Sequence, residues 1–127
     1  MEHNEKVYEY DAFISYRHIP SDMHIAETLH KALETYRTPS YLVKRGVAAR
    51  LKKVFRDKEE LPTSSDLGQD IEEALIASKY LIVICSPEAV QSQWVLREVE
   101  FFGEYHGYDK ILAYWWMASR RMPFRQA

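Results

Sequence analysis

Short segments rich in β-branched and aromatic residues alternate with longer amphipathic stretches along the chain. Strand signals of this kind occur over residues 7–15, 51–55, 80–85 and 110–114. Between them, apolar residues recur at helical spacing, so a helix is expected after each of the first three strands. This alternation is typical of a parallel sheet covered by helices on both faces. The pattern predicts an α/β fold, a flavodoxin-like doubly wound sheet with four or five parallel strands.

The run Leu81–Cys85 contains no polar residue, as expected for a strand that is buried on both faces. We therefore expect this strand near the centre of the sheet and the strand that begins at Lys110 at an edge. Helix boundaries follow from capping residues and from proline or glycine stops. The expected helices run from Ser21 or Asp22 to a stop at Pro39, from a cap at Ser65 or Asp66, and from about Ser92 to His106 before Gly107.

Length and charge restrict the class of protein. The 127 residues suffice for one domain, 46% hydrophobic residues exclude a disordered chain, and a formal net charge of −2 gives no reason to expect nucleic acid binding. One local basic cluster could meet phosphates or an acidic partner, although a solvated loop face is the favoured interpretation. Its members are Lys44, Arg45, Arg50, Lys52 and Lys53.

The sequence lacks the usual features of a metal-binding, secreted or membrane-spanning protein. Cys85 is the only cysteine and lies in an apolar run, so we expect a small buried hydrophobic residue rather than a nucleophile. The histidines show no ligand spacing, and no metal is expected. Residues 1–6 form a polar tail without the apolar core of a signal peptide, and no apolar run is long enough to span a membrane. The expected location is cytoplasmic.

Polar residues stand where the predicted strands end. Because the carboxyl ends of parallel strands meet at one edge of the sheet, these residues are candidates for a ligand site. On the last helix, Trp94 and Glu98 lie one turn apart on the same face. The residues that leave the strands are Ser15, Tyr16, Arg17, Arg56, Asp57 and Ser86.

Several of these segments together resemble the sequence boxes of Toll/interleukin-1 receptor (TIR) domains. The resemblance covers roughly residues 7–112, so residues 7–113 are expected to form a TIR domain. Its Trp-x-x-x-Glu helix is similar to the version in TIR domains that hydrolyse NAD, including bacterial defence proteins. The matching segments are residues 11–17, 54–57, 81–87 and 94–98.

The resemblance implies an NAD hydrolase that acts in signalling or defence and is activated by self-association. Glu98 is then the expected catalytic residue, because one carboxylate can stabilise the oxocarbenium-like transition state of nicotinamide release. NAD is the substrate, and no cofactor is implied. Arg17 and Arg56 offer donors for the diphosphate. The expected substrate-binding residues are Phe13, Ser15, Arg17, Phe55, Arg56, Ser86 and Trp94.

Other interpretations of these residues remain open. A single helical Glu98 is most often a solvated surface residue, and Trp94 and Phe13 are more often core residues than cofactor walls. Arg56 and Asp57 can belong to a charged loop with local ion pairs.

The main alternative function is a non-enzymatic TIR adaptor. In that case the loop 57–67 binds another copy of the domain through Leu61 and Pro62 at its tip. The two roles are compatible, and a sensor module on a longer chain is a further expected partner. A receiver-like domain lacks support, because no acidic pocket follows the first strand.

Residues 114–127 do not fit the resemblance, which predicts an apolar strand and then an acidic turn. The bases that encode Tyr114 to Ala118 can be read in another frame as Leu-Val-Asp-Gly, the sequence that relatives carry at this place. A frameshifted or truncated end and a divergent native tail are both compatible with the sequence.

Overall fold

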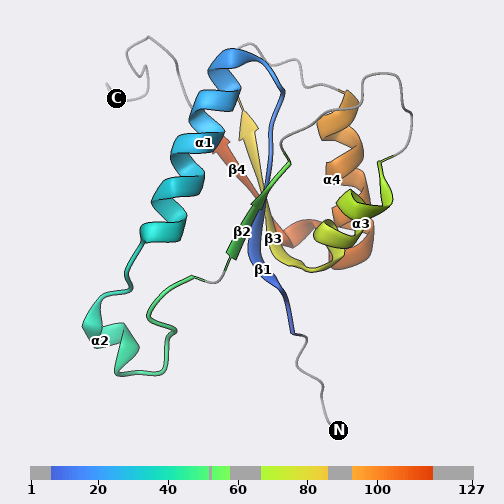
Figure 1. Ribbon diagram of the computed structural model, residues 1–127. Helices are drawn as coiled ribbons and strands as arrows, with labels where there is room; N and C mark the ends of the chain where they lie inside the picture. The colour runs from blue at the N-terminus through green and yellow to red at the C-terminus, as the bar shows by residue number, and fades with distance from the viewer. Residues whose placement is uncertain (1–6, 52, 58–66, 86–92, 116–127) are drawn as a thin grey trace, which may run out of the picture.

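The structure is a computed structural model that describes residues 7–51, 53–57, 67–85 and 93–115. One sheet of four parallel strands runs through it in the order β2-β1-β3-β4. This arrangement confirms the predicted α/β class, with β3 inside the sheet and β4 at an edge (Figure 1). The strands are β1 (Tyr10–Ser15), β2 (Lys53–Arg56), β3 (Ser78–Cys85) and β4 (Ile111–Trp115).

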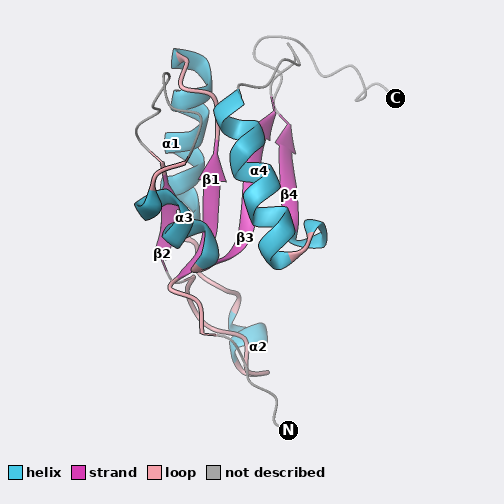
Figure 2. Cartoon of the chain, turned by 90° about the vertical axis from the view of Figure 1, so that its right-hand side faces the viewer, coloured by secondary structure: helices cyan, strands magenta, loops and turns pink. Residues whose placement is uncertain are grey.

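The helices cover the two faces of the sheet unequally. Figures 1 and 2 show α1 on one face and α3 with α4 on the other, while the short α2 lies beyond one end of the sheet. The short helix α2 was not predicted from the sequence pattern. The helices are α1 (Pro20–Thr35), α2 (Ser40–Val43), α3 (Gln69–Ile76) and α4 (Gln93–His106), followed by a 3₁₀ turn at Tyr108–Lys110.

Side chains alternate between the two faces of each strand, and this alternation divides the core in two. Phe13, Leu81 and Val83 pack with α3 and α4, whereas Ile14 and Ile84 pack on the face that α1 covers. β1 has a parallel neighbour on each side, and helices pack on both of its faces, so its side chains are buried over most of its length.

Helices α1 and α3 begin near, but not at, the residues that the sequence pattern indicated. Helix α1 begins at Pro20, whose fixed φ suits a first helical position, and Ile19 is its N-cap residue. Asp22 is fully buried and accepts a bond from Arg17, so its carboxylate is not available as a cap. Helix α3 has Gly68 as its N-cap residue, and the predicted caps Ser65 and Asp66 lie outside the described residues.

The edge strand β4 leaves part of its surface exposed. It continues two residues into the segment set apart by the sequence analysis, and Leu112, Tyr114 and Trp115 are all exposed. None of the described helices combines the length and hydropathy that a membrane crossing requires. The described residues also contain no group of three or more potential metal ligands.

Gly107 makes the turn between α4 and β4 possible. Its φ of +102° and ψ of 142° lie in a region that residues with a Cβ rarely adopt. We predict that Gly107→Ala lowers the free energy of unfolding by about 1–3 kcal/mol in urea denaturation. Gly68→Ala is the control, because φ of −70° there suits any residue and the expected loss is at most about 1 kcal/mol. Equal losses for the two variants would contradict the proposed strain.

Candidate active site

Two carboxylates and their donors meet at the carboxyl edge of the sheet. Ser15 ends β1, Asp57 follows β2, and Trp94 and Glu98 lie in the first half of α4. Counting along the strands in steps of two places Ser15 on the face of Phe13 and Asp57 on the face of Phe55. Since Phe13 and Phe55 both pack in the core cluster formed with α3 and α4, these polar groups come together above that cluster.

Glu98 is a buried residue, not the exposed helical residue that its sequence context suggested. Its exposed fraction is 0%. Ser15 Oγ donates a hydrogen bond of 2.6 Å to Glu98 Oε1. The second oxygen, Oε2, has no hydrogen-bond partner among the described residues. The carboxyl is therefore held at one oxygen and can accept another hydrogen bond at the other.

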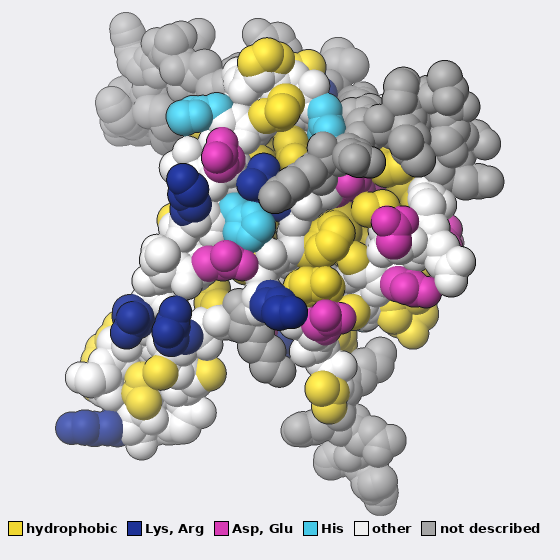
Figure 3. Space-filling view, viewed as in Figure 1, with side chains coloured by type: hydrophobic (Ala, Val, Ile, Leu, Met, Phe, Trp, Pro, Cys, Tyr) yellow, Lys and Arg dark blue, Asp and Glu magenta, His cyan; other side chains and the backbone are white. Residues whose placement is uncertain are grey.

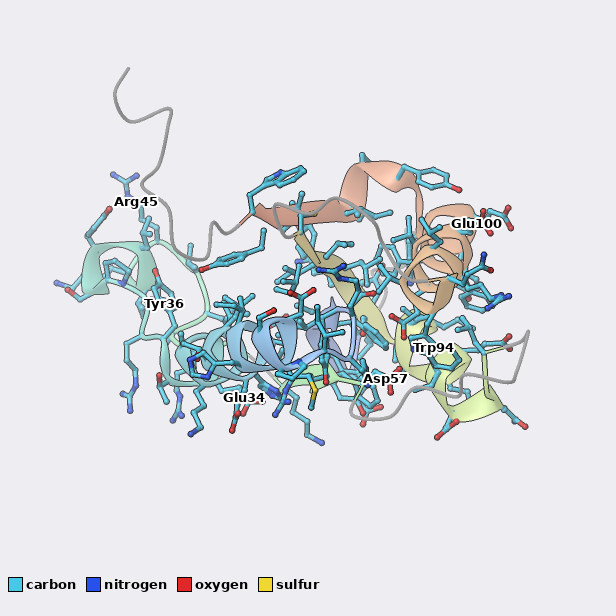
Figure 4. The ribbon with its side chains drawn as sticks, turned by 90° about the horizontal axis from the view of Figure 1, so that it is seen from above. Glu34, Tyr36, Arg45, Asp57, Trp94 and Glu100 are labelled. Atoms are coloured by element: carbon cyan, nitrogen blue, oxygen red, sulfur yellow. The ribbon has the colours of Figure 1, made fainter. Side chains whose placement is uncertain are left out.

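Trp94 is both a core residue and a polar partner of the site. Its ring is 3% exposed and packs against the core of the α3–α4 face. Its Nε1 donates a hydrogen bond of 2.7 Å to Asp57 Oδ2 (Figure 4). Asp57 is itself buried, so its interpretation as a solvated loop charge is wrong. One turn of α4 thus holds Glu98 and positions the second carboxylate.

Burial raises the pKa of the Glu98 carboxyl well above its ordinary value of 4.5. The hydrogen bond from Ser15 partly opposes this shift, and the nearby negative charge of Asp57 adds to it. A carboxyl with a raised pKa in a buried, polar setting is typical of functional sites. Once ionised, it can stabilise a developing positive charge or accept hydrogen bonds from sugar hydroxyls.

The two arginines named by the sequence analysis are engaged elsewhere. Arg17 Nε donates to Asp22 Oδ2 at 3.0 Å, and the Arg17 side chain is 15% exposed. Arg56 Nε donates to His30 Nδ1 of α1 at 3.0 Å, which places Arg56 on the face opposite Glu98. Either guanidinium has to leave or share its present partner before it can bind a phosphate.

Phe13 and Phe55 form a stacked pair beneath the polar groups of Ser15 and Asp57. Their ring centroids are 5.0 Å apart with an interplanar angle of 25°. Phe13 is 0% exposed and presents no free ring face, so it acts here as core. Phe55 is partly buried and also meets Tyr10 edge-on at 5.2 Å, on the side away from the carboxyl edge.

Asp57 and Tyr16 were named at the strand ends but not among the expected substrate-binding residues, and their burial was not predicted. Counting by two along β2 puts Asp57 on the same face as Phe55, which is the signal that could have identified it. Tyr16 is 2% exposed, and burial raises the pKa of its hydroxyl although the nearby Arg56 opposes the shift. Among the predicted site residues, Ser86, Leu61 and Pro62 lie outside the described residues.

Comparisons with known proteins agree with this arrangement. A curated protein named NAD(+) hydrolase ApTIR, from an Actinoplanes species, is 36% identical over 103 residues. That alignment covers 81% of this chain but only 13% of the relative. Among solved structures, the TIR domains of the activated Roq1 resistosome, which recognises the pathogen effector XopQ, superpose with a TM-score of 0.51 at 18% identity. This superposition covers 88% of the chain and 59% of the Roq1 chain.

The TIR domain family profile matches residues 12–112, a span that includes all four strands except the start of β1 and the end of β4. The buried Trp94 and Glu98 of α4 and the polar ends of β1 and β2 all lie within this span. The chain therefore belongs to the TIR domain family.

Proposed function

We propose that this chain cleaves NAD between nicotinamide and ribose, with Glu98 as the catalytic residue. The observation that carries the proposal is the buried Glu98 carboxyl, which accepts a bond from Ser15 at one oxygen and has no described partner at the other. The similarity to a protein named NAD(+) hydrolase supplies the substrate. Fold alone would not, since one fold hosts many functions.

The main requirement of the reaction is that the protein stabilises the positive charge that develops on the ribose. The C1′–N bond breaks, its electron pair stays on the nicotinamide nitrogen, and neutral nicotinamide leaves an oxocarbenium-like ribose. Water then adds to C1′ and loses a proton, which gives ADP-ribose. Ionised Glu98 would stabilise the positive sugar, and Ser15 would keep its carboxyl oriented.

Access to Glu98 requires rearrangement, because the carboxyl is 0% exposed. Trp94 and Asp57 would act as positioning residues that hold the first turns of α4 against the end of β2. Arg17 and Arg56 stay candidates for the diphosphate, provided that they leave or share their present partners Asp22 and His30. Activation by self-association stays a prediction. The cytoplasmic location also stays a prediction, and it agrees with an intracellular dinucleotide as substrate.

We predict that Glu98→Gln lowers the rate of nicotinamide release by at least about 100-fold, because the charged oxygen is lost while the shape is kept. The measurement is chromatographic detection of free nicotinamide at high protein concentration. The same variant should unfold at an equal or higher temperature at pH 7, since a carboxylate that is costly to ionise when buried has been removed. Glu100→Gln is the control, because Glu100 is exposed on the outer side of the same helix (Figure 4).

A folded Glu98→Gln protein that cleaves NAD at the wild-type rate would remove Glu98 from the mechanism. A wild-type protein that releases no nicotinamide at any concentration would contradict the enzymatic proposal and leave the adaptor function.

We also predict an unusual acid limb in the pH–rate profile. Because the reacting form is the carboxylate and its pKa is raised, kcat/KM should fall as pH decreases through a value clearly above the ordinary 4.5. Asp57→Asn removes the neighbouring negative charge and should move this limb to lower pH. A limb at the ordinary glutamate value that Asp57→Asn does not move would show that another group controls the rate.

A further inference from the structure

Residues 36–51 form a separate lobe, here called the basic lobe, beyond one end of the sheet (Figure 1). Helix α2 lies within it, and an antiparallel bridge between Arg37 and Arg50 closes its base. Thr38 ties the two sides together, since its N–H donates to Ala49 O at 2.9 Å and its hydroxyl donates to Ala48 O at 2.7 Å. The basic lobe is therefore an ordered projection rather than a loose loop.

Charge is distributed very unevenly between this region and the rest of the chain. The basic lobe contains four lysines and arginines, at positions 37, 44, 45 and 50, and no aspartate or glutamate. Because the whole chain has a formal net charge of −2 and the lobe carries +4, the remaining residues together carry −6. A contact between the two regions in different copies would be attractive at long range.

The basic lobe also exposes apolar surface between its charges. Tyr41 is 63% exposed and Tyr36 is 48% exposed, and Val43, Val47 and Leu51 are exposed as well. Arg45 lies on the outer part of this lobe, far from Trp94 (Figure 4). Aromatic and aliphatic side chains interspersed with arginine are typical of a protein-binding surface.

A groove with the opposite character lies between the sheet and α3. We call it the acidic groove. Its cavity has a volume of about 230 Å³, and its lining residues are Glu9, Tyr10, Phe55, Asp70, Glu73 and Ala74. Among the lining residues, Tyr10 and Phe55 form an edge-on aromatic pair, and the three acidic residues are exposed. Figure 3 shows hydrophobic side chains flanked by acidic ones on this face of the molecule. The cavity is several times the volume of one water molecule, roughly 30 Å³, and can admit a side chain.

We propose that the basic lobe of one copy docks into the acidic groove of a second copy. The two surfaces are complementary in charge, and each combines aromatic side chains with a charged rim. Within one chain, Lys53 Nζ lies 3.9 Å from Glu9 Oε2 at the rim of the groove. A basic side chain can therefore pair with a carboxylate of this rim. Tyr41 is the expected anchor, with Arg45 meeting the carboxylate of Glu73.

The contact joins different surfaces, so it adds copies head to tail. In both ribbon views α2 lies away from α3, and the basic lobe therefore remains available when the groove of the same copy is filled (Figures 1 and 2). A heterologous contact of this kind builds open chains unless its rotation closes a ring. A second copy is favoured over nucleic acid or an anionic membrane because this chain itself supplies the matching acidic surface. The proposal does not depend on NAD cleavage.

Charge reversal tests the pairing. We expect Arg45→Glu and Glu73→Lys each to weaken self-association by about tenfold or more in sedimentation velocity, since each places like charges together. A 1:1 mixture of the two variants, or the double variant, should recover most of the association, because the reversed charges pair again. The matched controls are Lys31→Glu on α1 and Glu104→Lys on α4, both exposed and outside the two surfaces. Raising the salt concentration should weaken the wild-type association.

Several outcomes would overturn the proposal. These are a wild-type protein that stays monomeric at high concentration, an association that Arg45→Glu leaves unchanged, and a mixture that shows no recovery. Loss of binding to phosphatidylserine vesicles or to single-stranded DNA in Arg45→Glu, without any change in self-association, would assign the lobe to those partners instead. Circular dichroism confirms that each variant is folded before it is compared.

Discussion

The hydrogen bond from Ser15 to Glu98 joins the end of β1 to the first half of α4, and the arrangement of the site depends on it. A carboxyl that loses its hydration on folding costs free energy unless another group satisfies it. Here the Ser15 hydroxyl donates a hydrogen bond to Glu98 Oε1, and Glu98 Oε2 has no partner among the described residues. The fold therefore accepts a destabilised group at this place, as is common where a side chain serves function rather than stability.

The alternation of side chains along the strands gives the two faces of the sheet different roles. On the α3–α4 face, Phe13 and Phe55 stack in the core while Ser15 and Asp57 extend the same rows to the polar edge. On the α1 face, Tyr16 and Arg56 form a separate polar group with His30. Residues that are neighbours in the sequence thus belong to different sites, because each step along a strand changes the face.

Much of the fold follows from the sequence pattern, whereas the environment of the site residues does not. The apolar run of β3 gives its interior position directly, since no polar residue can stand on either face of an interior strand at low cost. The burial of Glu98 is not readable in this way: a helical glutamate is usually solvated, and only the position of α4 over Ser15 changes that. Asp22 was expected at the start of the first helix, but its burial and its pairing with Arg17 depend on how the chain turns after β1. The basic lobe was visible as a charge cluster, but its projection from the body of the domain required the structure.

The protonation of Glu98 in the folded protein tests this interpretation most directly. The side-chain carboxyl carbon can be followed by ¹³C NMR as pH is varied, with Glu98→Gln to assign its signal. Wild-type protein should titrate with a pKa clearly above 4.5, Ser15→Ala should raise this pKa further, and Asp57→Asn should lower it. A Glu98 carboxyl that titrates at the ordinary value, and that neither substitution shifts, would mean that it is solvated and that Ser15 and Asp57 do not form a site around it.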